Sequence, residues 1–220
     1  MNYKRIILFA GHYGSGKTNI AVNVALHLQK ERGNVTIADL DIVNPYFRTE
    51  DSREELAQAG IRLICSEYAG TNLDAPALPP EMYAITDDRS MTAIMDIGGD
   101  DRGALALGRY TPAILEENDY EMLLIINGYR PLTRDAASTL EIIREIEAAG
   151  GIPFTAIVNN SNLGEETDAE TVLASLAYAE EISAATGLPI KMTTVREELF
   201  EELKDRIPNL FPLTLQYKIK

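Results

Sequence analysis

Eight consecutive residues near the start of the chain carry the side chains and the backbone freedom that binding of a polyphosphate requires. They are Gly11, His12, Tyr13, Gly14, Ser15, Gly16, Lys17 and Thr18. Glycine adopts backbone angles that other residues avoid, so successive N–H groups of such a loop can turn inward around a phosphate. Lys17 is then placed to reach the β- and γ-phosphates, and the Thr18 hydroxyl to ligate Mg²⁺. The alternative is a glycine-rich turn that binds no ligand.

Acidic residues follow two later apolar segments, each at the point where a strand is expected to end. Asp39 and Asp41 follow the first, and Asp96 ends the second, with Gly99 three residues further on. Open parallel sheets bind ligands beyond the carboxyl ends of their strands, so we expect Asp39 and Asp96 to be metal ligands. In nucleotide switches an Asp at this place holds Mg²⁺, and a Gly after it contacts the γ-phosphate, the role we assign to Gly99. Read alone, both patterns are also typical of ordinary turns and helix caps.

A third loop, after the apolar segment 154–158, is where a P-loop domain commonly contacts the nucleotide base. It reads Asn159-Asn160-Ser161-Asn162. A guanine reader would place an Asp three residues after the first Asn, because a carboxylate accepts from both N–H donors of guanine, and this chain has Asn162 there. An Asn amide pairs with the edge of adenine, so we expect Asn159 to contact the base and ATP to be preferred over GTP. The alternative is that Asn159 and Asn162 are turn residues.

The elements that must position these residues alternate between strands and helices. Apolar runs predict strands, and periodic runs bounded by Gly, Pro or capping residues predict helices. The expected strands are residues 6–10, 35–39, 61–65, 91–96, 122–126, 154–158 and 188–192, and the expected helices are 17–28, 52–59, 82–87, 104–117, 133–149 (capped by Thr133), 168–186 and 196–204. This alternation predicts one α/β domain over residues 1–220, with a doubly wound, mostly parallel sheet flanked by helices. Residues 207–220 are expected to form a tail.

The composition is typical of a protein with a buried core, and it argues against several classes of partner. The chain has 220 residues, of which 45% are hydrophobic, and 34 acidic residues outnumber 20 Lys and Arg to give a net charge of −14. So acidic a surface repels nucleic acid and anionic lipid, and no apolar run approaches the roughly 20 residues of a membrane span. We therefore expect a cytoplasmic protein with no nucleic-acid partner and no membrane anchor. The single cysteine, Cys65, excludes an internal disulfide, and its apolar neighbours predict a buried position.

Together these motifs make the chain similar to the MinD/ParA-like branch of the SIMIBI class of P-loop ATPases. The resemblance rests on the loop Gly-His-Tyr-Gly-Ser-Gly-Lys-Thr, on Asp39-x-Asp41, Asp96-x-x-Gly99, Asn127 to Arg134-Asp135 and Val158-Asn159, and on the phrase Asp-Ile-Val-Asn-Pro-Tyr-Phe-Arg, which a group of small ATP-binding proteins shares. It implies that Asp41 positions the attacking water and that Thr18 and Asp96 serve Mg²⁺. Most of that branch carries a second lysine after the first loop glycine, which reaches the nucleotide of a partner subunit, whereas this chain has His12 there. The resemblance also allows a homodimer across the nucleotide face, although this chain lacks that lysine.

Three functions from different classes fit these residues. The first is a Mg²⁺-dependent ATPase that acts as a conformational switch for an unidentified protein partner, with Lys17 and Asp41 as its catalytic residues. The second is a small-molecule kinase or ATP-dependent ligase, whose acceptor would bind near residues 46–48 and 76–80. The third is a module that binds nucleotide with little turnover, which the missing second lysine favours.

Overall fold

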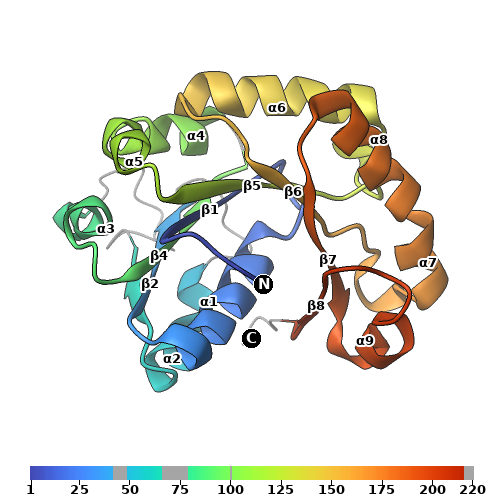
Figure 1. Ribbon diagram of the computed structural model, residues 1–220, viewed down its shortest axis with the longest axis horizontal. Helices are drawn as coiled ribbons and strands as arrows, with labels where there is room; N and C mark the ends of the chain where they lie inside the picture. Colours follow the sequence, from blue (N-terminus) through green and yellow to red (C-terminus); the bar gives the residue numbers. More distant parts are fainter. Residues whose placement is uncertain (42–48, 66–78, 100, 216–220) are drawn as a thin grey trace.

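A parallel sheet runs through the described part of the protein (Figure 1). The computed structural model describes residues 1–41, 49–65, 79–99 and 101–215. Within these residues the sheet has eight strands in the order β3-β2-β4-β1-β5-β6-β7-β8, and every neighbouring pair is parallel. The strands are β1 (Ile6–Ala10), β2 (Val35–Leu40), β3 (Arg62–Ile64), β4 (Thr92–Ile97), β5 (Tyr120–Ile126), β6 (Ala156–Asn159), β7 (Ile190–Arg196) and β8 (Leu210–Leu213). The predicted α/β class with a parallel sheet is confirmed.

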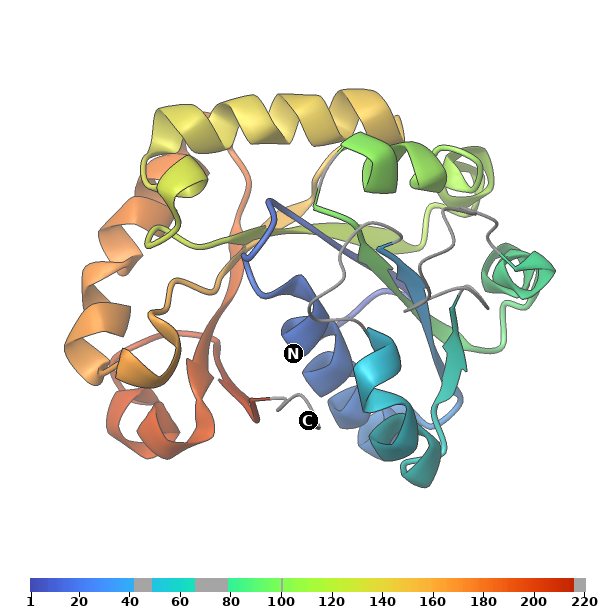
Figure 2. The same cartoon turned by 180° about the vertical axis from the view of Figure 1, so that it is seen from behind.

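Helices cover both faces of the sheet (Figures 1 and 2). They are α1 (Lys17–Arg32), α2 (Arg53–Gln58), α3 (Ala84–Asp87), α4 (Asp101–Leu107), α5 (Thr111–Glu117), α6 (Ala136–Gly150), α7 (Ala169–Ala174), α8 (Leu176–Thr186) and α9 (Glu197–Leu203), with a 3₁₀ turn, η1 (Thr49–Ser52), before α2. On one face α1 and α2 bury Leu28 and Leu56, and on the other α4 and α5 bury Leu107 and Ile114 beside α6 and α8. None of the described helices is long and apolar enough to cross a lipid bilayer.

The residues of β1 explain why both faces need a cover. Ile6, Leu8 and Ala10 belong to the core beneath α4, α5 and α6, whereas Ile7 and Phe9 belong to the core beneath α1. This division follows from the strand itself, because successive side chains point to opposite faces of a sheet. Since β1 lies between β4 and β5, the chain goes from β1 to β2 on one side and later crosses to β5 on the other. The carboxyl end of β1 is therefore the reversal point at which open α/β sheets bind ligands.

Two helices that were predicted as continuous are each divided in two. Residues 104–117 form part of α4 and all of α5, because Gly108 follows α4 and Pro112 lies in the first turn of α5, where its missing N–H leaves no hydrogen bond unmade. Residues 168–186 form α7 and α8, and the break lies at Ser175. The hydroxyl of Ser175 donates to a backbone carbonyl one turn earlier, which competes with the helical pattern.

The predicted helix cap at Thr133 is also corrected. Thr133 ends a short 3₁₀ turn, and its hydroxyl donates to the backbone carbonyl of Asn127 at 2.7 Å. The N-cap of α6 is Asp135, whose carboxylate accepts from the backbone N–H of Ser138 at 2.9 Å. An N-cap must precede the first helical residue directly, and Asp135 does so.

The predicted tail contains a strand that sequence patterns did not indicate. Within residues 207–220, β8 pairs in parallel with β7 at the edge of the sheet. Pro212 argues against a strand, because proline has no N–H to donate to a neighbouring strand. An edge strand tolerates proline, since one of its two sides needs no partner.

Arg5 forms a buried ion pair with Glu117 at the end of the sheet where β1 begins. The exposed fractions of the two side chains are 9% and 7%. The Arg5 guanidinium also donates to the backbone carbonyls of Ile85 and Met91, so it ties α3 and the start of β4 to β1. We expect Glu117→Gln to lower the free energy of unfolding by about 3 kcal/mol, because the Arg5 charge is left buried without its counter-ion. Urea unfolding followed by circular dichroism measures this loss.

Glu116→Gln is the matched control for this prediction. Glu116 precedes Glu117 in the chain and is exposed, so its replacement should change the free energy of unfolding by less than about 0.5 kcal/mol. A loss below about 1 kcal/mol for Glu117→Gln would show that water compensates the Arg5 charge and that the pair behaves as a surface salt bridge.

Candidate functional site

The glycine-rich loop joins β1 to α1, in the strand, loop and helix context predicted for it. Its glycines adopt left-handed backbone angles, with φ at 75° for Gly14 and 92° for Gly16. A Cβ atom on Gly11 would lie 2.4 Å from the backbone oxygen of Ile125. On Gly16 it would lie 2.2 Å from the amide nitrogen of Asn160. The loop therefore needs glycine both for its shape and for the close approach of its neighbours.

Lys17 begins α1, and its amino group turns back onto the loop. The residue is 5% exposed, and its Nζ donates to the backbone carbonyl of His12 at 3.3 Å. The backbone N–H of Ser15 donates to the same carbonyl at 3.1 Å. The ammonium charge and the N-terminus of α1 thus lie together, and both favour an anion at this place.

Two side chains from outside the loop hold its carbonyl oxygens. The Arg130 Nε donates to the carbonyl of Gly14 at 3.0 Å, and the Asn160 Nδ2 donates to the carbonyl of Ser15 at 2.6 Å. The other end of the Asn160 amide accepts from the hydroxyl of Thr194 on β7 at 2.6 Å. Asn160 is buried, so its amide is a fixed link from β7 to the loop. The loop is thereby positioned by its surroundings before a ligand arrives.

Asp39 and Asp96 lie side by side because β2 and β4 are neighbours. The parallel register pairs Asp39 with Asp96 and Asp96 with Phe9 of β1, and Phe9 belongs to the core beneath α1. Paired residues point to the same face of a sheet, so both carboxylates face α1. Asp96 is completely buried and Asp39 is 4% exposed. The structure therefore places the two predicted metal ligands on the face of the sheet that α1 covers.

The surroundings of Asp96 fit a magnesium ligand. One carboxylate oxygen accepts from the Thr49 hydroxyl at 3.0 Å, and the other is buried and accepts no hydrogen bond from the described residues. Burial is the largest influence on the pKa of Asp96, and it raises this pKa overall. The Asp41 carboxylate also raises the pKa, whereas the Lys17 ammonium and the Thr18 and Thr49 hydroxyls lower it. A carboxylate oxygen without a donor, beside the Thr18 hydroxyl, belongs to the oxygen-ligand set that Mg²⁺ prefers.

Few protein ligands would be expected for such an ion. Within residues 1–41, 49–65, 79–99 and 101–215, no three His, Cys, Asp or Glu side chains form a metal-binding cluster. Mg²⁺ keeps several waters and takes one or two carboxylates plus phosphate oxygens in nucleotide sites. The arrangement around Asp96 therefore suits Mg²⁺ bound together with a nucleotide.

Asp41 and the glycines that follow β4 lie close to Asp96 and Lys17 at the carboxyl end of the sheet. Asp41 is 4% exposed, and its backbone N–H donates to the Asp39 carboxylate at 2.9 Å. A Cβ on Gly98 would lie 3.3 Å from the Asp41 carboxylate, which places this carboxylate against the end of β4. A Cβ on Gly99 would lie 2.9 Å from the Lys17 Nζ. Gly99 therefore lies in contact with Lys17, and its predicted contact with a γ-phosphate stays a prediction.

The first turn of α4 packs directly onto the end of β4. A Cβ on Gly103 would lie 2.4 Å from the Cα of Gly98. In the other direction, a Cβ on Gly98 would lie 3.0 Å from the Cα of Gly103. The two backbones touch at this point with no side chain between them.

Asn159 faces away from this site, which corrects its predicted role as a base contact. The register pairs it with Ile126, which lies in the core beneath α6 and α8. Its amide is completely buried, donating to the Ser175 hydroxyl at 2.9 Å and accepting from the Ser161 N–H at 3.2 Å. Because successive residues alternate across a sheet, the next residue, Asn160, contacts the glycine-rich loop instead.

Three other polar residues bond within their own segments. The His12 Nδ1 lies 3.0 Å from the Tyr13 carbonyl, so the imidazole packs along the loop that carries it. The Asn162 Nδ2 donates to the Asn160 carbonyl at 2.7 Å, which is the behaviour of a turn residue. Arg134 pairs with its neighbour Asp135 at 3.6 Å on the surface.

Sequence reasoning missed Thr49, the buried donor to Asp96. Thr49 is completely buried and begins η1. Its run with Glu50, Asp51 and Ser52 is typical of a helix start, which is the only signal that the sequence offered. Residues 46–48 and 76–78, proposed to frame an acceptor pocket, lie outside the described residues.

Cys65 is half-buried, which corrects the prediction that it is a buried hydrophobic residue. Its thiol donates to the Glu50 carboxylate at 2.8 Å and accepts from the Arg53 guanidinium at 2.9 Å. Burial, followed by the hydrogen bond to Glu50, raises the pKa of the Cys65 thiol to about 12. Such a thiol is a poor nucleophile at neutral pH.

Solved structures with a similar fold include the signal recognition particle receptor FtsY and the signal recognition particle 54 kDa protein. No family model matches the chain, and no curated protein is similar to it in sequence. The signal recognition particle receptor FtsY from Elizabethkingia anophelis is 18% identical over 90% of this chain and 60% of that chain, with a TM-score of 0.56. FtsY from Thermotoga maritima is 18% identical over 87% of this chain and 62% of that chain, with a TM-score of 0.59.

A third similar structure is the signal recognition particle 54 kDa protein from Aeropyrum pernix, solved in complex with GDP. It is 16% identical over 87% of this chain and 41% of that chain, with a TM-score of 0.54. The chain thus spans about three fifths of the length of the FtsY chains, at 60% and 62%. At these identities the likeness is one of fold: an α/β fold of the P-loop NTPase type, with a parallel sheet between helices.

Proposed function

We propose that the protein binds ATP with Mg²⁺ and hydrolyses it as a nucleotide-driven switch. One observation carries this proposal: the Lys17 amino group of α1 meets the Asp96 carboxylate and the Gly99 backbone, which belong to the end of β4 and the residues after it. Similarity in fold to FtsY and to the 54 kDa protein supports the nucleotide-binding part of the proposal, since structures of both were solved in complex with GDP.

Each residue of the site has a role in this proposal. The loop and Lys17 bind the phosphates, while Thr18, Asp39 and Asp96 would hold Mg²⁺. Bound Mg²⁺ neutralises charge that develops on the transferred phosphoryl group. Asp41 orients the attacking water from the segment after β2, and the Gly99 N–H contacts the γ-phosphate. Loss of the γ-phosphate removes the Gly99 contact, which is the switching event.

ATP is the proposed nucleotide although Asn159 does not face the site. Residues 159–163, which end β6 and follow it, read Asn-Asn-Ser-Asn-Leu and contain no carboxylate. Guanine offers two adjacent N–H donors, for which a carboxylate is the matching acceptor, whereas adenine does not need one. The GDP complexes of FtsY and of the 54 kDa protein make a direct comparison of the two nucleotides the decisive measurement.

The MinD/ParA-like resemblance extends the proposal to a dimer across the nucleotide face. Large apolar side chains are exposed on the segments that follow β1, β4, β5 and β6 in the chain. They are Tyr13, Leu105, Tyr129, Leu132 and Leu163, between 37% and 61% exposed. Exposed large apolar side chains are typical of interaction surfaces when they form one patch. A second copy of the chain would cover them when ATP is bound.

Titration calorimetry with ATP and with GTP, each with and without Mg²⁺, tests the proposal. We expect ATP to bind at least about tenfold more tightly than GTP, a difference of roughly 1.4 kcal/mol. Phosphate release should require Mg²⁺, and sedimentation velocity should detect dimers with ATP but not with ADP.

Other outcomes separate the alternative functions. Binding without phosphate release would identify a nucleotide-binding module, and release only in the presence of a metabolite would identify a kinase or ligase. Tighter binding of GTP would overturn the base assignment alone. A lack of binding by either nucleotide to folded protein would overturn the whole proposal.

A further inference from the structure

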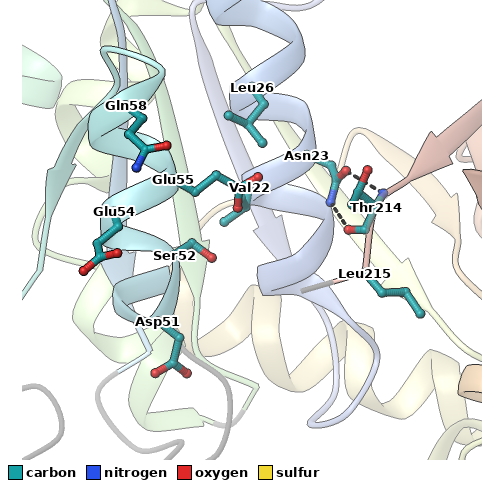
Figure 3. A pocket seen from close by; sticks show the side chains of 10 residues that line it. All are labelled: Val22, Asn23, Leu26, Asp51, Ser52, Glu54, Glu55, Gln58, Thr214 and Leu215. Carbon is teal, nitrogen blue, oxygen red and sulfur yellow. Dashed lines mark hydrogen bonds between the residues drawn. The ribbon is translucent and has the colours of Figure 1, made fainter. Parts of the chain in front are cut away.

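A groove of about 310 Å³ lies between α1, α2 and the residues after β8 (Figure 3). Its lining includes Val22 and Leu26 of α1, Asp51 of η1, Glu54 and Glu55 of α2, and Leu215 beyond β8. One wall is therefore apolar and the other acidic. Since no residue of the glycine-rich loop lines it, this groove is distinct from the proposed nucleotide site.

Two carboxylates of the acidic wall, Glu54 and Glu55, have no basic partner among the described residues. Glu54 and Glu55 are exposed, and neither forms an ion pair with a described residue. Arg53, the basic residue of α2, pairs with Glu50 at 2.5 Å instead. Figure 3 shows the Glu55 side chain directed across the groove toward Val22 of α1. A cationic segment in the groove would meet this carboxylate.

The chain itself leads into the groove. The Thr214 N–H donates to the Asn23 side chain at 2.9 Å, and the Asn23 amide donates to the Thr214 carbonyl at 3.0 Å, so the chain is attached to α1 here (Figure 3). Leu215 lines the groove, and residues 216–220 follow it with the sequence Gln-Tyr-Lys-Ile-Lys. This sequence alternates between polar and apolar residues. In an extended segment such alternation gives one apolar side and one cationic side.

We propose that residues 216–220 bind in this groove of their own chain. Tyr217 and Ile219 would lie against the apolar wall at Leu26, and Lys218 would pair with Glu54 and Glu55. Three extended residues after Leu215 span roughly 10 Å, about the diameter of a helix, so Lys218 can reach α2. Because α2 continues η1, whose Thr49 donates to Asp96, the bound segment would brace the strand end that carries the proposed site. The proposal does not depend on nucleotide binding.

The rate at which an N-hydroxysuccinimide ester acetylates each lysine tests the proposal. Mass spectrometry gives the rate for Lys218 relative to Lys30, an exposed lysine of α1. A paired and covered ammonium reacts slowly, so we expect Glu54→Gln/Glu55→Gln to raise the relative rate at least about threefold. Raising the salt concentration from 10 mM to 0.5 M should speed the reaction of the unchanged protein, because salt screens exposed ion pairs.

Glu141→Gln/Glu145→Gln on α6 is the matched control, since both residues are exposed and the net charge changes equally. This control should leave the relative rate unchanged. Tyr217→Ser is a second variant that alters neither helix, and it too should accelerate the reaction. Equal rates in the α2 variant and the α6 control would overturn the proposal. So would protection of Lys218 that increases with protein concentration, because the occupant would then be the segment of a second copy.

Discussion

Replacement of Lys17 by alanine is expected to reduce ATP affinity by at least about 100-fold, since charge-assisted hydrogen bonds to phosphate oxygens would be lost. Lys17 is 5% exposed, its Nζ is bonded to the loop carbonyl of His12, and Gly99 lies against it. Within the described structure it is therefore a cation held inside the proposed phosphate site. Isothermal titration calorimetry with Mg²⁺ and ATP measures the loss.

Two controls make this result specific. Lys30→Ala removes an exposed lysine from the last turns of the same helix and should leave ATP affinity within about twofold. Lys17→Met keeps most of the apolar length of the side chain and should behave like Lys17→Ala, because the charge is what the phosphates require. If either Lys17 variant bound ATP within tenfold of the unchanged protein, the loop would not be a phosphate site.

The second large effect is expected for Asp41→Asn, which should slow ATP hydrolysis at least about 100-fold while leaving ATP affinity within about threefold. Asn keeps the size of the side chain but removes the negative charge that orients and polarises a water. Asp41 is 4% exposed, and its carboxylate lies against Gly98 at the end of β4, next to Gly99. Phosphate release at saturating ATP measures the rate, and calorimetry measures the affinity.

Asp119→Asn is the control for this prediction. Asp119 lies just before β5 and pairs with Lys4 on the surface, at the other end of the sheet from the proposed site. Its replacement should leave turnover unchanged. Equal turnover in the Asp41 variant and the unchanged protein would remove Asp41 from the mechanism, and a parallel loss of affinity would make it a binding residue.

The loop and most of the elements could be predicted because their signals are local. The glycines from Gly11 to Gly16 mark a turn that only glycine can make, and the apolar runs that precede the early loops mark strands. The positions of Asp39 and Asp96 also follow from local patterns, because parallel strands bring their carboxyl ends to one edge of the sheet. The two carboxylates lie next to each other because β2 and β4 are neighbouring strands.

The sequence could not predict which face of the sheet a strand residue lies on, or which strands are neighbours. Both depend on contacts between residues that are distant in the chain. A strand that is buried on both faces reads as a continuous apolar run, so its sequence does not indicate which residues share a face. This is why the base contact was assigned to Asn159 and the loop contact of Asn160 was missed. Pro212 argued against a strand within residues 207–220 for a related reason. Only the complete sheet determines that β8 lies at its edge, where proline is tolerated. Thr49 reaches Asp96 across 47 positions of sequence, and no local pattern records such a distance.

The backbone contact between Gly98 and Gly103 has a mechanical consequence. With no side chain between them, neither segment can shift toward the other without an overlap of atoms. A movement of the end of β4 toward α4 would therefore displace α4 directly. Leu105, on the same helix, is 61% exposed. In the proposed nucleotide switch, loss of the phosphate beside Gly99 would therefore shift α4 together with its exposed Leu105.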